Sequence, residues 1–339
     1  MLTDQKMKAV YFNVGGSTEI LYFGDIALSD HHNEGQVLVR IKAIGINPID
    51  CKIRTHPERF PVTYPVIPGC DGAGIVEAVG AQVDNFKPGD EVYFSQPAFN
   101  NRQGTYAEYV KVDASLLALK PRSLSFEQAA AVPLVFITAW EALHDRAHIA
   151  QDHIVLIHAG AGGVGHAAIQ LAKLAGAHVI ATVSTEAKAN FVKRLGADLV
   201  INYRSQDVIA EVLRWTNDNG VDIVFDTVGP EILQSCFRCV KPYGDVVTIL
   251  QSAPDTDWSE ARKRNVRFSL ELMLTPVLLE LEDAKRHQGE ILRQCAGLFD
   301  AHKLQVEIAR TFTLRDAAAA QNFLEQNHPI GKLVLIVDS

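Results

Sequence analysis

The sequence lacks the features that would place it in a membrane or in an oxidising compartment. No apolar run approaches the ~20 residues of a membrane-spanning helix. The segment from Met1 to Lys8 has no apolar stretch of the kind a signal peptide needs. The five cysteines are widely scattered and odd in number, which indicates reduced thiols. We therefore expect a cytoplasmic protein.

An excess of positive charge is also missing. The formal net charge is −8, and acidic and basic residues are interspersed. Binding to nucleic acid or to a membrane surface needs a basic face, so neither partner is expected. Repeats and low-complexity tracts are absent as well. We expect a small-molecule substrate, and we expect the protein to form a homodimer.

The most informative motif present is Gly160-Ala161-Gly162-Gly163-Val164-Gly165. It follows the apolar run 153–159, a predicted buried strand, and precedes 166–175, a predicted helix. Strand, Gly-x-Gly-x-x-Gly and helix together predict a dinucleotide-binding turn. The first glycine permits the tight turn, the second lets the pyrophosphate approach the backbone, and the third lets the helix pack on the strand.

The pattern of expected secondary structure changes near residue 126. Before it, short strands are punctuated by Gly, Pro and Asp, which predicts a small β-barrel-like domain. These strands are expected at 8–12, 36–42, 74–79 and 91–94. After it, strands alternate with helices, which predicts a parallel sheet. Those strands are expected at 178–183, 199–201, 222–225, 245–250 and 266–270. We expect a loop over 252–264, helices over 277–304 and 314–326, and a final strand over 332–337.

Several motifs, in this order and spacing, give the chain a family resemblance. They are Gly45-Ile-Asn-Pro-Ile-Asp50, Pro68-Gly-Cys-Asp-Gly-Ala-Gly74, Lys87-Pro-Gly-Asp90, Ala129-Ala-Ala-Val-Pro133, Thr138-Ala-Trp140, the glycine turn, Ile201-Asn-Tyr-Arg204, Asp226-Thr-Val-Gly229 and Gly331-Lys-Leu-Val-Leu335. From Met7 to the C-terminus the chain resembles the medium-chain dehydrogenases/reductases, and within them the quinone oxidoreductase branch.

The resemblance implies an α/β fold in which a Rossmann domain, a doubly wound parallel sheet, is inserted in a GroES-like β-barrel catalytic domain. We expect the catalytic domain at 1–128 and 272–339 and the Rossmann domain at 129–271. The family also implies a nicotinamide held in the cleft between the two domains.

The resemblance argues against zinc. Zinc alcohol dehydrogenases of this superfamily have a Cys where this chain has Asn47, a His-Glu pair where it has Cys70-Asp71, and a further Cys near Leu134. A catalytic zinc site needs about three protein ligands, and the matching positions lack a third. The pair Cys236-x-x-Cys239, in a predicted helix with no nearby histidine, does not indicate a metal or redox centre. Surface or packing roles are expected for His31 and His32 in a polar loop and for His144 and His148 in a helix.

The cofactor is expected to be NADPH. The strand 178–183 ends in Ser184-Thr185 rather than in the carboxylate that usually binds the ribose of NAD. Ser184, Lys188 and Tyr203 can donate to a 2′-phosphate, and in the quinone reductase branch positions matching Lys188 and Tyr203 do so. A solvated surface is the alternative interpretation. The expected cofactor-binding residues are Asn47, Thr138, Gly160, Ala161, Gly162, Gly163, Val164, Gly165, Ser184, Lys188, Tyr203, Val228, Ile249, Leu250 and Lys332.

The candidate catalytic residues are Asn47, Asp50 and Tyr64. Asn47 matches the family's active-site Asn, although it can also hold the turn before Pro48. Asp50 is either a proton-relay carboxylate or a helix cap, and the cap is favoured. Relatives often have a tyrosine soon after this segment, whereas here the nearest one is Tyr64. Lys332 matches a cleft residue, but a Lys at the start of a strand is often simply solvated.

These features predict a zinc-independent, NADPH-dependent reductase of quinones or α,β-unsaturated carbonyls. Without a metal to stabilise an alkoxide, alcohol oxidation is not expected. Two alternatives stay open at this point. One is a zinc-free reductase of simple carbonyls, and the other is a nucleotide-binding protein with little turnover.

Overall fold

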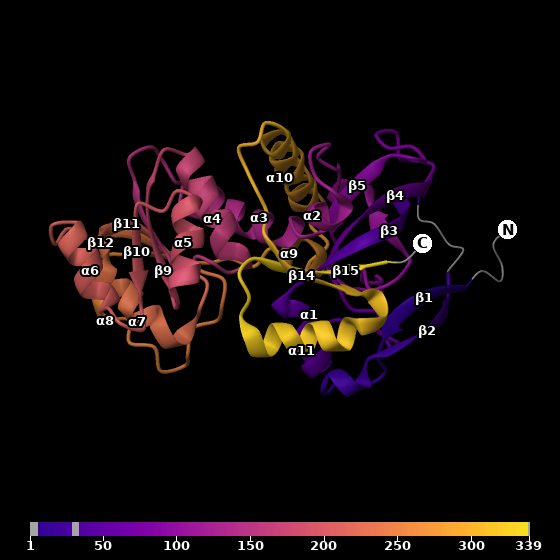
Figure 1. Ribbon diagram of the computed structural model, residues 1–339, viewed down its shortest axis with the longest axis horizontal. Coiled ribbons are helices and arrows are strands. Elements are labelled where there is room, and N and C mark those ends of the chain that lie inside the picture. The colour runs from indigo at the N-terminus through magenta and orange to yellow at the C-terminus, as the bar shows by residue number, and fades with distance from the viewer. Residues whose placement is uncertain (1–5, 29–33, 338–339) are drawn as a thin grey trace. The chain divides into compact units, whose positions relative to one another are not determined.

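The computed structural model describes residues 6–28 and 34–337, which form two compact units. The first, here the split unit, contains residues 1–134 and 274–339, and the second, here the parallel-sheet unit, contains 135–273 (Figure 1). The expectations for residues 1–5 and for His31 and His32 lie outside the described residues.

The parallel-sheet unit contains a six-stranded sheet in the order β10-β9-β8-β11-β12-β13, with all neighbours parallel. Its strands are β8 (Ile154–Ile157), β9 (His178–Val183), β10 (Leu199–Asn202), β11 (Val221–Asp226), β12 (Val240–Thr248) and β13 (Arg267–Leu270). Its helices are α4 (Gly163–Leu174), α5 (Glu186–Arg194), α6 (Val208–Trp215), α7 (Pro230–Cys239) and α8 (Ser259–Lys263). Helix α3 (Pro133–Trp140) and the π-helical turn η4 (Glu141–Arg146) precede them. The strand order reverses between β8 and β11, and such a switch point is where open α/β sheets bind ligands.

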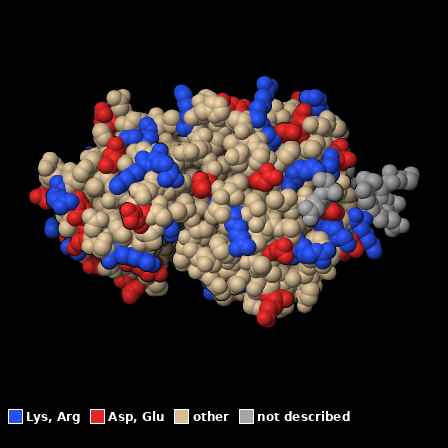
Figure 2. Space-filling model, viewed as in Figure 1, with Lys and Arg blue, Asp and Glu red and all other residues tan. Residues whose placement is uncertain are grey.

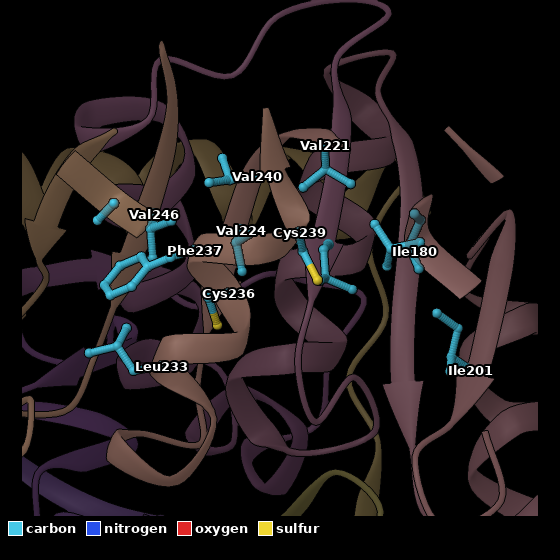
Figure 3. Close-up of a cluster of buried hydrophobic side chains, with 13 residues drawn as sticks. Ile180, Ile201, Val221, Val224, Leu233, Cys236, Phe237, Cys239, Val240 and Val246 are labelled. Atoms are coloured by element: carbon cyan, nitrogen blue, oxygen red, sulfur yellow. The ribbon is translucent and has the colours of Figure 1, made fainter. Parts of the chain in front are cut away.

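Alternating side chains of the sheet face two layers of helices. On one face, Leu156, Ile180 and Val224 pack with buried residues of α6, α7 and α8 (Figure 3). Ala181, next to Ile180, faces the other side, where Ile169 of α4 and Val192 of α5 lie. Both faces are covered, which explains why these strands read as near-continuous apolar runs.

The split unit is mostly antiparallel. Its large sheet has the order β14-β15-β3-β4-β5-β7, with β6 also paired to β3, and β1 and β2 form a separate pair. The strands are β1 (Lys6–Tyr11), β2 (Tyr22–Ala27), β3 (Gln36–Ile46), β4 (Asp71–Val79), β5 (Glu91–Ser95), β6 (Tyr109–Asp113), β7 (Leu117–Leu119), β14 (Ile308–Thr313) and β15 (Lys332–Ile336). The helices are α1 (Pro48–Thr55), α2 (Phe126–Ala130), α9 (Thr275–Leu278), α10 (Glu282–Asp300) and α11 (Ala317–Asn327). Single helical turns are η1 (Thr18–Ile20), η2 (Pro57–Arg59), η3 (Ala114–Leu116) and η5 (Leu314–Asp316). Because β15 pairs with β3, the two ends of the chain share one sheet.

Three local predictions were wrong. The helix expected over 277–304 is broken between α9 and α10, where Glu280 has a left-handed φ of 54°. The loop expected over 252–264 contains α8. His148 lies outside any helix, with a φ of 47°. His144 lies in η4, and its ring contacts that of Trp140 in a tilted arrangement with 4.6 Å between ring centroids.

The surface matches the interspersed charges of the sequence. On the face shown in Figure 2, basic and acidic side chains alternate with uncharged ones. Within residues 6–28 and 34–337, no helix combines the length and the apolar character needed to cross a bilayer.

Candidate active site

The glycine turn lies where β8 ends and α4 begins, beside the switch point of the sheet. Gly162 is the N-cap residue of α4. A Cβ on Gly165 would lie 2.4 Å from the carbonyl oxygen of Ala159, so only glycine lets the helix pack this close to the strand. A Cβ on Gly160 would lie 3.0 Å from that of Ala181, which leaves little room for one. The N–H groups of the first turn of α4 have no intrahelical acceptor and point outward, as an anion site requires.

Gly162 fits the approach of a phosphate. An added Cβ there would meet only the carbonyl oxygen of Ala159, at 3.3 Å, so the space beyond the Gly162 backbone is open. The glycine turn therefore fits a dinucleotide by its own geometry. Ala161 is buried behind the turn, and Gly163, Val164 and Gly165 form the first turn of α4.

The carboxyl ends of β9 and β10 bring together the residues expected to bind a 2′-phosphate. The N–H of Tyr203 donates to the carbonyl of Val183 at 3.1 Å, so Tyr203 lies beside the end of β9, where Ser184 follows. Lys188 lies in the first turn of α5, and its N–H donates to Thr185, the N-cap residue, at 3.3 Å. The ring of Tyr203 is half exposed.

Asp226, which the sequence analysis names within a family motif but not as a site residue, organises a third edge of the site. Its Oδ1 accepts hydrogen bonds from the N–H groups of Val228 at 2.8 Å and Gly229 at 3.0 Å. Its Oδ2 accepts one from the Thr248 hydroxyl at 2.8 Å. Because Thr248 ends β12, this carboxylate fixes the Val228 loop beside Ile249 and Leu250. A buried carboxyl at the end of a strand, followed by Gly, was the available signal.

His158 connects the glycine turn to the Val228 loop. It directly follows β8, and its carbonyl accepts a hydrogen bond from the Thr227 hydroxyl at 2.8 Å. Its ring lies 3.3 Å from the Thr182 hydroxyl and 3.6 Å from the Cys236 sulfur. The expectation that no histidine lies near the Cys236 pair was therefore wrong. Burial lowers the pKa of His158 to about 4, so the ring is neutral near pH 7. Thr138, the remaining expected residue of this unit, is buried in α3.

The split unit contains a buried polar cluster built around Asn47. Its register is set by strand pairing, because Leu333 pairs with Ile46 and Gly45 pairs with Asp71. Asn47 Nδ2 donates to Asp71 Oδ2 at 2.9 Å, and Asn47 Oδ1 accepts a hydrogen bond from Lys332 Nζ. Sequence spacing gave no sign of this contact, which joins residues 285 positions apart.

Lys332 is buried rather than solvated, with a side chain 4% exposed. Its ammonium also donates to the carbonyl of Ile46 at 2.8 Å and lies 3.7 Å from Asp71 Oδ2. Burial lowers the pKa of Lys332, while Asp71 opposes that shift. The solvated alternative for Lys332 is therefore wrong, and direct contact with a cofactor would require the ammonium to leave these partners.

Asp50 caps α1 as expected. Its Oδ2 accepts hydrogen bonds from the Asn47 N–H at 2.9 Å and from the Tyr106 hydroxyl at 3.2 Å. The carboxyl is fully buried, and burial raises its pKa to about 7. Asp50 is therefore a cap that can also hold a proton at neutral pH.

Tyr64 lies apart from this cluster. Its side chain is 50% exposed, and its ring packs edge-on against Phe12. Among the described residues, no hydrogen bond joins Tyr64 to Asn47 or Asp50.

The positions that match zinc ligands in relatives hold Asn47, Cys70, Asp71 and Leu134. The backbone N–H of Leu134 donates to Asp71 Oδ1 at 3.0 Å. The described part of the chain contains no group of three His, Cys, Asp or Glu side chains suited to a metal ion.

Comparison with known proteins places these features in a family. Residues 33–122 match the model of the alcohol dehydrogenase GroES-like domain, and residues 195–335 match that of the zinc-binding dehydrogenases. The chain is similar to quinone oxidoreductase 1 of Escherichia coli (strain K12), with 32% identity over 96% of this chain and 98% of the relative. It is also similar to the chloroplastic NADPH-dependent alkenal/one oxidoreductase of Arabidopsis thaliana, with 32% identity over 98% of this chain and 80% of the relative.

The fold has a close counterpart among solved structures. The structure of E. coli quinone oxidoreductase complexed with NADPH superposes with a TM-score of 0.86, at 29% identity, covering 97% of this chain and 99% of that one. The parallel-sheet unit is thus a Rossmann fold and the split unit is GroES-like, as the sequence predicted.

Proposed function

Because the chain belongs to the medium-chain dehydrogenase/reductase superfamily, in its quinone oxidoreductase branch, we propose that this enzyme reduces quinones or α,β-unsaturated carbonyls with NADPH and without zinc. One observation carries the choice of acceptor. The position where zinc relatives have a Cys ligand holds Asn47, whose amide is engaged by Lys332 and Asp71. An acceptor that delocalises incoming negative charge over its own conjugated system suits such a site.

The glycine turn and the edges beside it are proposed to hold the cofactor. The turn from Gly160 to Gly165 receives the pyrophosphate, and Ser184, Lys188 and Tyr203 receive the 2′-phosphate. Val228, Ile249 and Leu250 border the same carboxyl edge of the sheet, and Asn47 and Thr138 complete the proposed contacts. Lys332 is proposed to support this set through Asn47, because its ammonium donates to Asn47 and to the carbonyl of Ile46. When bound, the nicotinamide supplies a hydride.

Asn47, Asp50 and Tyr64 are the proposed catalytic residues. Asp50 is suited to hold a proton because burial raises its pKa to about 7. Tyr64 offers an accessible phenol, since its side chain is half exposed. Both ends of the Asn47 amide are engaged, so we propose that Asn47 shapes the turn between β3 and α1 as well as facing the reaction.

The remaining assignments complete the proposal. We assign the catalytic domain to 1–128 and 272–339 and the cofactor domain to 129–271. All five cysteines are free and buried, which suits a reducing compartment such as the cytoplasm. A homodimer is proposed as the assembly.

The proposal is tested by NADPH oxidation with a panel of acceptors. We expect turnover with 1,4-benzoquinone or a simple enone, and no reduction of NADP⁺ by primary alcohols. Activity confined to simple aldehydes would indicate a carbonyl reductase instead. Binding of NADPH without turnover of any quinone or enone would defeat the proposal.

A further inference from the structure

Beside Asn47, two buried carboxyls of the split unit lie near the buried ammonium of Lys332. Asp50 and Asp71 are both fully buried; the ammonium of Lys332 lies 3.7 Å from Asp71 Oδ2 and acts on Asp50 through its charge. An isolated buried charge is costly, so this ammonium compensates carboxylates that would otherwise lie unpaired. Removing it would leave two neighbouring buried carboxyls without this compensating charge, directly behind the turn between β3 and α1, and would raise the pKa of both.

The same ammonium also sets the orientation of Asn47. A carboxylate can only accept hydrogen bonds and an ammonium can only donate them. The amide oxygen of Asn47 must therefore face Lys332 and its nitrogen must face Asp71, as the structure shows. The N–H of Asn47 in turn binds Asp50. Lys332 thereby holds the side-chain amide of Asn47 by a hydrogen bond and acts on Asp50 through its charge.

We propose that Lys332 is a positioning residue of the reaction, and that its positive charge is the property on which turnover depends. It fixes the Asn47 amide and offsets the negative charge of Asp50 and Asp71, behind a site whose acceptor gains negative charge. The inference rests on the proposed function.

Charge has an effect that packing alone would not produce, because Lys332 and Asp71 act on Asp50 with opposite signs. The ammonium lowers the pKa of Asp50 and the Asp71 carboxylate raises it. The titratable groups facing Asp50 are Asp71 on β4, Lys332 on β15, Cys70 before β4, Cys51 on α1 and Tyr106 before β6. Burial raises the pKa of both thiols and of the phenol, so these three stay neutral near pH 7.

The test compares Lys332→Met, Asp71→Asn and the double variant, with NADPH and the best quinone or enone from the panel. We expect Lys332→Met to lower kcat about ten-fold or more. The pH profile of kcat should move to higher pH in Lys332→Met and to lower pH in Asp71→Asn.

The double variant separates charge from folding. It has no unpaired ionised partner left from this pair, so its thermal unfolding midpoint should recover toward that of the wild type. In the double variant, the side-chain amide of Asn47 can rotate to face Asn at position 71 in either orientation. Because the amide is then no longer fixed, kcat should stay low.

Recovery of kcat together with the midpoint in the double variant would show that Lys332 serves folding alone and would overturn the inference. The inference would also be overturned if the pH profiles of kcat moved in the same direction in the two single variants, or did not move. This second comparison requires only that the single variants are soluble. If the wild-type enzyme turns over no quinone or enone, the proposed function fails first, and the inference fails with it.

Discussion

At the scale of single residues, Lys188 is the side chain that decides the cofactor in our proposal. Replacing it by Ala should reduce the preference for NADPH over NADH. A charge-assisted hydrogen bond contributes roughly 1.5–3 kcal/mol, which corresponds to about ten-fold or more in the ratio of affinities. Titration of both cofactors by fluorescence measures that ratio. Lys193→Ala, an exposed position in the last turn of the same helix, is the control. An unchanged ratio in Lys188→Ala would mean that another group holds the phosphate.

Asp50 gives a second prediction at this scale, for the pH dependence of stability. Its pKa is about 7 in the folded protein against 3.8 as a free side chain. The folded state therefore binds more protons between these values, and the carboxyl destabilises the fold increasingly as the pH rises from about 4 to about 7. Below that window the penalty is absent, and above it the penalty is constant.

Asp50→Asn should remove this penalty, because the amide oxygen can still accept the hydrogen bond from Asn47. The variant should gain stability over the wild type across that window, by on the order of a few kcal/mol at pH 8. Urea unfolding at several pH values measures the difference. Asp84→Asn, at an exposed carboxyl, should show no such trend. A difference between Asp50→Asn and the wild type that does not vary with pH would contradict the expectation.

At the scale of elements, the glycine turn separates two roles that the sequence motif lists together. Gly165→Ala places a methyl group 2.4 Å from a backbone oxygen, so helix α4 must move away from β8. Overpacking of this kind costs about 1–3 kcal/mol, and both the unfolding midpoint and the affinity for NADPH should fall. Gly162→Ala meets that oxygen only at 3.3 Å and has an ordinary φ of −76°. It should lose less stability than Gly165→Ala yet bind NADPH more weakly, because its methyl group would lie where we propose that the phosphate approaches. Equal effects of the two substitutions on stability would contradict this assignment.

Elements that follow from a local sequence pattern could be predicted, and elements that depend on contacts between residues far apart in the sequence could not. The β8-turn-α4 unit follows from glycine spacing and an apolar run, both local. Strand β14 was not predicted, since its six residues are exposed or half buried and show no apolar run. The break between α9 and α10 is held by Glu280, which binds Arg102 at 2.5 Å and Lys285 at 2.7 Å. Arg102 lies 178 residues from Glu280, a separation that helical periodicity does not report.

At the scale of the whole molecule, segments from both ends of the chain supply the side chains around Asn47. The residue types around Asn47 predicted the lack of a third metal ligand, and their matching positions came from the family resemblance. The ammonium that engages Asn47 comes from the last strand, and only the pairing of β15 with β3 places it there. The resemblance therefore showed that a ligand position holds Asn47 and named Lys332 as matching a cleft residue, whereas the contact between the two could be found only in the fold.

This arrangement leads to a prediction for metal content. A divalent cation bound by Asn47 and Asp71 would lie beside the ammonium of Lys332, which is 3.7 Å from Asp71 Oδ2, and the two positive charges would repel each other. Protein purified from zinc-supplemented medium should therefore hold far less than one equivalent of zinc by elemental analysis. Its turnover of a quinone or enone should survive prolonged treatment with a chelator. A zinc alcohol dehydrogenase carried through the same treatment should lose activity, which controls for the strength of chelation. Stoichiometric zinc together with loss of turnover on chelation would show that Lys332 gives way to the metal, and alcohol oxidation would then return as a reaction open to this enzyme.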